Sequence, residues 1–367
     1  MEKETVLVIF GGHNTEYYAS CDSVGGMLDH LDRDLFDVLK IGVTEEGDWL
    51  LTEASSAEIG DGKTWLRRKD NRRAVITPVR GKRAVTAFDS RGRTEEIPID
   101  CVFPLISGYG GEDGTLQGLL ELADIPYVGS KVASSACAMD KQLTRIFARK
   151  CGVKQPRCLV LYRKDWEKQA ESLPDMIGFD YPVFVKPASL GSSVGVSRVD
   201  RQEDLRQAAE EAFAYEDKIL VEEGILGSEI KVALLGNEDL DMGAICQLTL
   251  SEGQVNDYAA KHIHFSSDKQ IPADLPAELE HRIRKQAEDI YRALDCRGFA
   301  RVDFFLDKKG ELYFNEINTV PGIGERSIFA LMFEKKGIPL KEVLTRLIRL
   351  AQTDRERSSA RLLKAVH

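Results

Sequence analysis

A short stretch near the C-terminal end of the chain combines the alternation of a β-strand with side chains that are unusual in one. Residues 313–322 read "YFNEINTVPG", in which apolar and aromatic residues alternate with Asn315, Glu316 and Asn318. Successive side chains of a strand point to opposite faces of a sheet, so a strand here would have one polar face. An acid and an amide on that face need a partner that satisfies their oxygen atoms.

The preceding strand-like stretch, residues 301–306 ("RVDFFL"), is predicted to pair with it as a hairpin about Lys309-Gly310, because glycine tolerates the positive φ of a tight turn. Asp303 then lies opposite Glu316 on one face of the sheet. Two opposed carboxylates repel unless a cation lies between them, and carboxylate and amide oxygens without His or Cys suit a hard ion such as Mg²⁺. The hairpin therefore predicts a magnesium site; the alternative is a solvent-exposed face on which polar residues occur by chance.

The other predicted pairs are Arg301 with Asn318 on the polar face, and Val302 with Ile317 and Leu306 with Tyr313 on the core face.

A loop rich in Gly and Ser follows a second predicted strand. Residues 184–197 read "FVKPASLGSSVGVS", with Lys186 at the end of the strand and Ser192 and Ser193 in the loop. Backbone N–H groups flanked by small side chains bind phosphate oxygens, and the hydroxyl groups add donors. The pattern is not a Walker A loop, and a loop of this composition is often only a flexible connection. Together with the hairpin, it predicts a site for a phosphorylated ligand.

Two other predicted strand ends carry acidic residues beside glycines. Residues 11–20 read "GGHNTEYYAS", where Glu16 is expected either at the surface or bound to an ammonium group at the mouth of an α/β domain. Residues 105–118 read "LISGYGGEDGTLQG", where Glu112 and Asp113 precede a predicted helix and are expected to cap it. The glycines of both loops would let a substrate approach the backbone closely.

Length and composition indicate a globular protein of several domains. The chain has 367 residues, of which 43% are hydrophobic and 30% charged, so two or three domains are expected. A formal net charge of −10 argues against nucleic acid or an anionic membrane as a partner. The N-terminal apolar run is too short for a signal peptide, and no segment has the ~20 apolar residues of a membrane span. Seven scattered Cys without a C-x-x-C pair indicate a reduced, cytoplasmic protein.

Taken together, the motifs resemble those of the D-alanine–D-alanine ligases of the ATP-grasp superfamily. The resemblance extends from about residue 4 to about residue 352, and its most specific pieces are "GGEDGTLQGLLELADIPYVGS", "AMDK", "VKPASLGSSVGVS", "ALDCRGFARVDFF" and "NEINTVPG". It implies an α/β ATP-grasp fold of three α/β domains, with ATP between the sheets of the central and C-terminal domains. The expected domains are 1–130 (N-terminal substrate domain, with peripheral hairpins and loops in 52–97), 131–226 (central), 227–353 (C-terminal, with the hairpin) and 354–367 (a charged, frayed tail).

The resemblance also implies a nucleotide and metal site. ATP and a pair of Mg²⁺ or Mn²⁺ ions are the implied cofactors. The implied metal ligands are Asp303, Glu316 and Asn318. The residues implied to contact ATP are Lys141, Lys186 and Ser193 at the phosphates, and Glu222 and Glu229 at the adenine and ribose.

The implied reaction is ATP-dependent joining of two D-alanines through an acyl phosphate, which would supply D-alanyl-D-alanine for peptidoglycan precursors. The resemblance further suggests a homodimer. The residues implied to act on the amino acids are Glu16 and Ser192 at the ammonium of the first D-alanine, Arg301 and the backbone N–H of Gly322 at the oxyanion, Lys261 and His262 on a mobile loop, and Ser327 and Ile328 at the second amino acid.

The chain departs from the family pattern around the amino-acid pockets, which leaves D-serine and D-lactate open as second substrates. Because His262 titrates at about pH 6.5 when unperturbed, acceptor choice is expected to change with pH. A catalytically inactive nucleotide-binding regulator is a further alternative, and a transition-metal site at His262-x-His264 is not favoured because no suitable third ligand lies nearby in the sequence. The departures are Ser107 in place of His, His262 in place of Tyr, Gly324 in place of Thr, followed by Glu325 and Arg326, and Ala330 in place of Pro.

Overall fold

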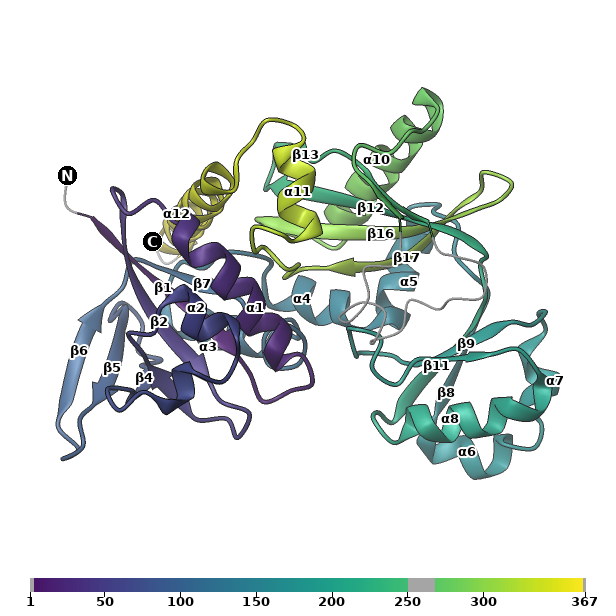
Figure 1. Ribbon diagram of the computed structural model, residues 1–367, viewed down its shortest axis with the longest axis horizontal. Helices are drawn as coiled ribbons and strands as arrows, with labels where there is room; N and C mark the ends of the chain where they lie inside the picture. Colours follow the sequence, from purple (N-terminus) through teal and green to yellow (C-terminus); the bar gives the residue numbers. More distant parts are fainter. Residues whose placement is uncertain (1–2, 250–267, 366–367) are drawn as a thin grey trace.

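The computed structural model describes residues 3–249 and 268–365, with side chains described as far as Glu356 on the last helix. Three β-sheets with flanking helices make up this part of the chain, in agreement with the expected α/β class. Figure 1 shows the seven-stranded sheet at the left, the six-stranded sheet above the centre and the four-stranded sheet at the lower right. Within the described ranges, no helix has both the length and the apolar character needed to cross a bilayer.

The seven-stranded sheet is formed by the N-terminal part of the chain. Residues 52–97 were expected at its periphery, and they do form its edge strands, but Trp65 from this segment is fully buried with its ring 5.1 Å from that of Phe10. The Trp65 indole N–H donates to the hydroxyl of Tyr17 at 3.0 Å, so the segment is part of the core. The elements are the parallel strands β1 (Glu4–Gly11), β2 (Phe36–Val43) and β7 (Cys101–Pro104), the antiparallel strands β3 (Trp49–Leu51), β4 (Arg72–Ile76), β5 (Ala84–Phe88) and β6 (Thr94–Pro98), and the helices α1 (Tyr17–Met27), α2 (Ser56–Gly60) and α3 (Thr115–Ala123).

The four-stranded sheet is antiparallel and has a separate small core. Two helices precede it, and they pack against the six-stranded sheet instead, with Ala138 and Ala148 in the core of that sheet. The first two helices of the expected central domain, residues 131–226, therefore pack against the six-stranded sheet and not against the four-stranded sheet. The elements are α4 (Val132–Met139) and α5 (Lys141–Lys150), then β8 (Cys158–Tyr162), α6 (Arg163–Gln169), α7 (Leu173–Ile177), β9 (Val183–Pro187), β10 (Ser197–Val199), α8 (Leu205–Phe213) and β11 (Lys218–Glu223).

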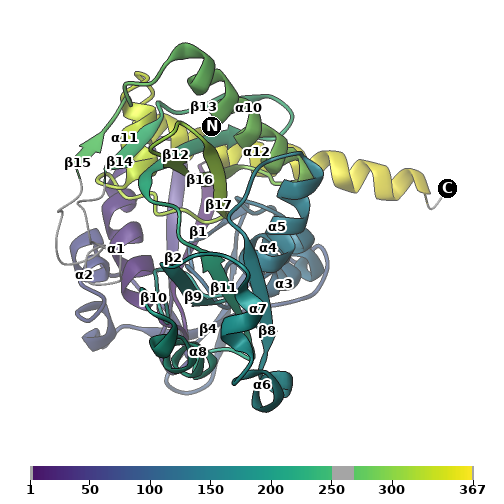
Figure 2. The same cartoon turned by 90° about the vertical axis from the view of Figure 1, so that its right-hand side faces the viewer.

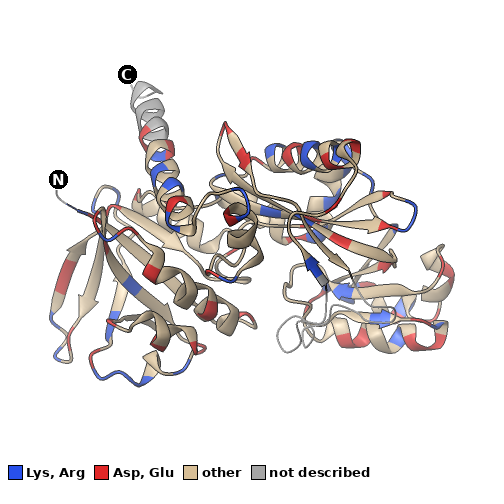
Figure 3. Cartoon of the chain, turned by 45° about the horizontal axis from the view of Figure 1, so that its top comes forward, with Lys and Arg blue, Asp and Glu red and all other residues tan. Residues whose placement is uncertain are grey.

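The six-stranded sheet carries the predicted hairpin at its edge, in the order β15-β14-β12-β16-β17, with β13 paired to β12. Acidic and basic residues are interspersed over this sheet and its helices, as they are over the other two sheets (Figure 3). The strands are β12 (Gly227–Gly236), β13 (Leu240–Met242), β14 (Cys246–Thr249), β15 (Asp268–Gln270), β16 (Phe299–Asp307) and β17 (Leu312–Asn318), and the helices are α10 (Ala277–Ala293), α11 (Ile328–Glu334) and α12 (Leu340–Ala365).

The predicted hairpin register is confirmed on the half that carries Asp303 and Glu316 and is wrong on the half nearer the turn. Asp303 pairs with Glu316, and the two predicted pairs beyond them, 301 with 318 and 302 with 317, are also present. A β-bulge then leaves Asn315 without a partner residue, so Leu306 pairs with Leu312 and not with Tyr313. An extra residue in one strand shifts every later pair by one position, and bulges commonly redirect side chains beside functional sites.

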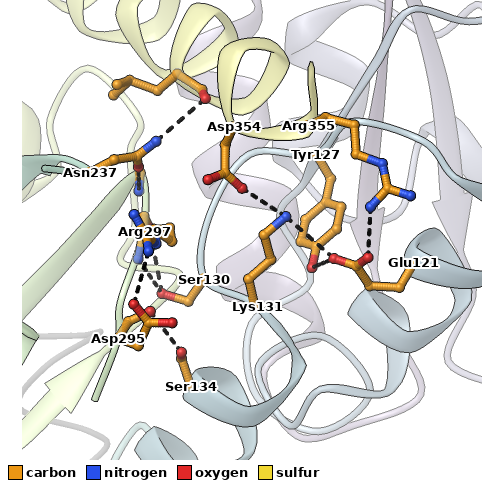
Figure 4. Close-up of polar contacts among 12 residues, drawn as sticks. Glu121, Tyr127, Ser130, Lys131, Ser134, Asn237, Asp295, Arg297, Asp354 and Arg355 are labelled. Atoms are coloured by element: carbon orange, nitrogen blue, oxygen red, sulfur yellow. Dashed lines mark hydrogen bonds and ion pairs between the residues drawn. The ribbon is translucent and has the colours of Figure 1, made fainter. Parts of the chain in front are cut away.

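The long helix α12 joins the seven-stranded and six-stranded sheets. Its apolar residues share one core with β1 and with β12, so the two sheets form a continuous packing unit. The frayed tail expected after residue 353 is wrong, because α12 continues to Ala365, and its end projects from the body of the protein (Figure 2). Arg355 is 6% exposed and pairs with Asp124. Figure 4 shows its other pair, with Glu121 of α3, and the pair of Lys131 with Asp354. These ion pairs hold the helix against the N-terminal part of the chain.

Candidate active site

The candidate active site lies where loops from all three sheets meet. Glu16 stands at the start of α1, and Ser192 lies in the loop after β9. The Ser192 hydroxyl donates to Oε1 of Glu16 at 2.5 Å, which joins loops that lie 176 residues apart in the sequence. The two residues were expected to act as a pair, and the structure brings them into contact.

Two glycines make room for the carboxylate of Glu16. A Cβ atom on Gly108, whose φ is +73°, would lie 2.3 Å from Oε2 of Glu16. A Cβ atom on Gly191 would lie 2.8 and 2.9 Å from its two carboxylate oxygens. All three distances are too short for non-bonded atoms, so any larger residue at either position would displace the Glu16 carboxylate.

The Gly/Ser loop itself has a strained backbone. Ser192 and Ser193 have φ values of +50° and +61°, in the left-handed region that residues with a side chain rarely adopt. Each such residue costs on the order of 1–3 kcal/mol and persists where surrounding contacts impose it. Here Lys141 Nζ donates to the carbonyl of Leu190 at 2.7 Å, and the N–H of Val194 donates to the carbonyl of Gly191 at 3.1 Å. The loop is therefore held in a fixed shape beside Glu16.

Lys141 connects this loop to the hairpin. It is the first residue of α5, is 8% exposed, and its Nζ lies 3.8 Å from Oε2 of Glu316 on β17. Burial lowers the pKa of the Lys141 ammonium, and Lys186 nearby lowers it further, whereas Glu316 and Glu222 act in the opposite direction. Lys141 is thus a largely buried lysine with another lysine and two carboxylates nearby. A cation in such surroundings can bind an anion such as a phosphate.

Glu222 on β11 is held by two cations. Lys186 Nζ pairs with one of its carboxylate oxygens, and Arg145 Nη1 donates to the other at 2.8 Å. All three residues are at most 8% exposed. Arg145 was not predicted; it lies four residues after Lys141, on the same face of α5, and this i, i+4 spacing was the available signal.

The polar face of the hairpin carries a second cluster of buried charges. Arg301 donates to both oxygens of Asp303 at 2.8 Å, and Lys231 of β12 lies 2.8 Å from Oδ2 of Asp303 and 2.9 Å from Oε2 of Glu229. Lys231 was also missed, although period-two alternation in β12 puts it on the face of Glu229. Burial opposes the charged form of Asp303, but Arg301 and Lys231 outweigh it and lower the pKa of this carboxyl to about 2. In turn, Asp303 keeps the pKa of Arg301 and Lys231 above their ordinary values despite burial.

Glu112 is a further acid at the site, and the expectation that it caps α3 is wrong. The carboxylate of Asp113 accepts the N–H of Thr115, the first residue of α3, at 2.9 Å and that of Gly110 at 2.8 Å, so of the two acids it is Asp113 that binds the start of the helix. Burial raises the pKa of Glu112 well above its ordinary value, and the nearby carboxylates of Glu16 and Glu316 raise it further.

The raised pKa of Glu112 makes folding stability depend on pH. Since the folded protein holds this proton above pH 4.5, where the unfolded chain has lost it, stability is present at low pH and falls as the pH rises. We therefore expect Glu112→Gln to increase the melting temperature relative to the parent by an amount that grows from pH 5 to pH 8. Melting curves in a series of buffers test this, with the exposed Glu334→Gln as control. A difference that is constant with pH would contradict the assignment.

Residues 319–327 connect β17 to α11 and pack on α1. The N–H of Ile323 donates to Oγ of Ser23 at 2.9 Å, and the N–H of Glu325 donates to the carbonyl of Gly26 at 3.0 Å. A Cβ atom on Gly324 would lie 3.2 Å from the carbonyl oxygen of Ser23, so the departure at this position allows close contact with α1.

Three residues expected at the amino acids lie in this segment or directly after it. Gly322 is exposed there, and Ser327 and Ile328 mark the start of α11. The hydroxyl oxygen of Ser327 accepts the N–H of Ala330 at 3.1 Å, so it caps the helix while its own O–H can still be donated. Lys261 and His262 lie outside the described residues.

Comparison with known proteins agrees with this geometry. Residues 5–130 match the family described as "D-ala D-ala ligase N-terminus", and residues 147–349 match "D-ala D-ala ligase C-terminus". The chain belongs to the D-alanine–D-alanine ligase family. It is 40% identical to a D-alanine–D-alanine ligase of Caldicellulosiruptor bescii over 99% of this chain and 100% of that protein. Membership of this ATP-using ligase family confirms the resemblance seen in the sequence.

Solved structures of D-alanine–D-alanine ligase family members share the fold. The D-alanine–D-alanine ligase from Coxiella burnetii superposes with a TM-score of 0.85 at 30% identity, covering 100% of both chains. The VanG D-Ala:D-Ser ligase from Enterococcus faecalis superposes with a TM-score of 0.84 at 35% identity, covering 95% of this chain and 100% of that one. The expected ATP-grasp architecture is therefore confirmed.

The residues predicted to bind metal in this D-alanine–D-alanine ligase family member have suitable donor types. Asp303, Glu316 and Asn318 share one face of the hairpin and offer carboxylate and amide oxygens, which fit a hard divalent cation. The side chain of Glu316 is 26% exposed, whereas that of Asp303 is 2% exposed and already bonded to two cations. In the described parts of the chain, no three His, Cys, Asp or Glu side chains form a ready metal cluster. The fit is therefore better at Glu316 than at Asp303.

Proposed function

We propose that the protein joins two D-alanines to D-alanyl-D-alanine with conversion of ATP to ADP, through an acyl phosphate. The observation that carries this proposal is the convergence of the Glu16–Ser192 pair with Lys141 and Glu316 around one strained Gly/Ser loop. An ammonium-binding acid beside phosphate-binding cations is the arrangement that phosphorylation of an amino-acid carboxylate requires. Formation of D-alanyl-D-alanine for peptidoglycan precursors follows as the biological role.

The chain's own residues account for the first step. The Glu16 carboxylate, fixed by Ser192, would bind the ammonium of the first D-alanine and so orient its carboxylate towards the loop. Lys141 and Lys186 would bind the phosphate oxygens of ATP, because Lys141 already donates to the Gly/Ser loop and Lys186 lies at the end of β9, just before that loop; both residues are 8% exposed. Transfer of the γ-phosphoryl group to the D-alanine carboxylate gives an acyl phosphate, which is a better electrophile than the carboxylate.

In the second step the amine of the second D-alanine would attack the carbonyl carbon of the acyl phosphate and expel inorganic phosphate, which requires stabilisation of a tetrahedral oxyanion. Arg301 stays cationic, because Asp303 raises its pKa, and its guanidinium is oriented by two hydrogen bonds. An oriented cation near the reacting carbonyl stabilises the developing charge without reorganisation. The N–H of Gly322 is a second candidate donor at this position. Bound at Glu316, Asn318 and Asp303, Mg²⁺ or Mn²⁺ would neutralise the charge of the transferring phosphoryl group.

D-Serine or D-lactate as the second substrate is the main alternative to D-alanine, and one structural relative is a D-Ala:D-Ser ligase.

The test is ADP formation measured with D-alanine and with D-alanine plus D-serine or D-lactate, followed by identification of the products at pH 6 to 8. We expect D-alanyl-D-alanine at pH 8 and a growing share of D-serine or D-lactate product below about pH 6.5. His262→Tyr should flatten this profile. An absence of ADP formation with every acceptor would contradict the proposed function and favour a nucleotide-binding regulator.

We further propose that the protein acts in the cytoplasm as a homodimer. All seven Cys are free, which supports a reducing compartment such as the cytoplasm. A homodimer is proposed from the family, and light scattering coupled to size-exclusion chromatography would test it.

A further inference from the structure

Lys231 is a buried lysine between two carboxylates on the charged face of the six-stranded sheet. β12 pairs with β16 so that Lys231 lies directly beside Asp303, and Glu229 lies two residues away on the same face. The Lys231 ammonium therefore bridges the two carboxylates, with 2.8 Å to Asp303 and 2.9 Å to Glu229, and its side chain is 7% exposed.

The carboxylate of Asp303 has little capacity left for another cation. Its Oδ1 accepts Nε of Arg301, and its Oδ2 accepts both Nη2 of Arg301 and Nζ of Lys231. A divalent ion bound to Asp303 would have to displace the Lys231 ammonium or lie beside it. If it lay beside it, the ion and the buried ammonium would repel each other strongly. Glu316 on the next strand is more open to solvent, as described above, and lies opposite Asp303.

We propose that Lys231 is a resident cation that takes the place of one divalent ion next to Asp303, so that a single tightly bound ion is held mainly by Glu316 and Asn318. This inference rests on the proposed function, since it assumes that nucleotide and divalent ions bind at this face. Lys231 acts as a positioning residue: it supplies positive charge and fixes Asp303 and Glu229, and through them Arg301.

The consequence is a lower demand for free divalent cation. Because the Lys231 ammonium already supplies one positive charge beside Asp303, only one divalent ion has to bind together with the nucleotide. Removal of the Lys231 charge would free one lone pair of Asp303 and remove the repulsion, so a second ion should then bind. A purely structural lysine would leave the number of bound ions unchanged.

The test is a titration with Mn²⁺, followed by electron paramagnetic resonance, in the presence of a non-hydrolysable ATP analogue. For the parent protein we expect one tight Mn²⁺ and a second site weaker by at least about tenfold. Lys231→Met, which removes the charge but keeps the volume, should tighten the second site by at least about tenfold and make ADP formation depend more steeply on Mg²⁺. Lys231→Gln keeps a hydrogen-bond donor and should behave like Lys231→Met, and the exposed Lys309→Met on the same hairpin serves as control.

Two outcomes would overturn the role of Lys231. The first is a parent protein that binds two Mn²⁺ with equal affinity, which can be decided without any variant. The second is an unchanged second site in both Lys231 variants with normal nucleotide binding. A failure of the parent to bind any Mn²⁺ with the nucleotide, together with no ADP formation, would overturn the proposed function as well.

Discussion

Replacing Glu316 by Gln is expected to lower the rate of ADP formation by about a thousandfold, or about 4 kcal/mol of transition-state stabilisation. The side chain is the most open acid of the hairpin face, and Lys141 lies 3.8 Å from it, so the substitution removes a negative charge from the site proposed to bind metal and phosphate. The change in volume is small, and the fold should be retained. The measurement is the steady-state rate of ADP formation with saturating ATP and D-alanine, alongside the melting temperature.

Glu311→Gln is the matched control for this variant. It lies on the same hairpin, its side chain is 47% exposed, and it pairs with Lys154 at the surface. Surface ion pairs contribute little, so this variant should keep both the parental rate and a melting temperature within a few degrees. Parental ADP formation by Glu316→Gln would contradict the metal-site assignment.

Glu16→Gln is expected to raise the D-alanine concentration for half-maximal rate by about a hundredfold, which corresponds to about 2.7 kcal/mol. A neutral amide retains hydrogen bonding but loses the charge that binds an ammonium, and hydrogen bonds to charged groups are worth about 1.5–3 kcal/mol. Affinity for an ATP analogue, measured by calorimetry, should not change. Initial rates over a wide range of D-alanine concentrations give the comparison.

Gly108→Ala provides an independent test of the same site. The added methyl group would lie 2.3 Å from Oε2 of Glu16, so it should displace the carboxylate and reproduce the effect of Glu16→Gln on D-alanine. The exposed Glu46→Gln serves as control. If both variants at the site bind D-alanine as the parent does, Glu16 does not hold the amino acid.

Much of the hairpin was predictable because its signals are local. Alternation with period two and the glycine turn determine which residues of neighbouring strands share a face, and these gave the pairs Asp303–Glu316 and Arg301–Asn318. The bulge at Asn315 was not predictable from this pattern, since an unpaired residue changes neither the turn before it nor the alternation after it. For that reason the register failed only on the side of the turn.

Contacts between distant segments were decided by the tertiary structure. The sequence by itself determined the strands, the Gly/Ser loop, the charged motifs and, through their order, the resemblance to the D-alanine–D-alanine ligases. It did not determine that Arg145 would meet Glu222, that Lys231 would bridge Glu229 and Asp303, or that α12 would continue past residue 353 with Arg355 buried. A buried charge becomes favourable only when an opposite charge is brought to it, and the packing of three separate sheets decides which charges meet.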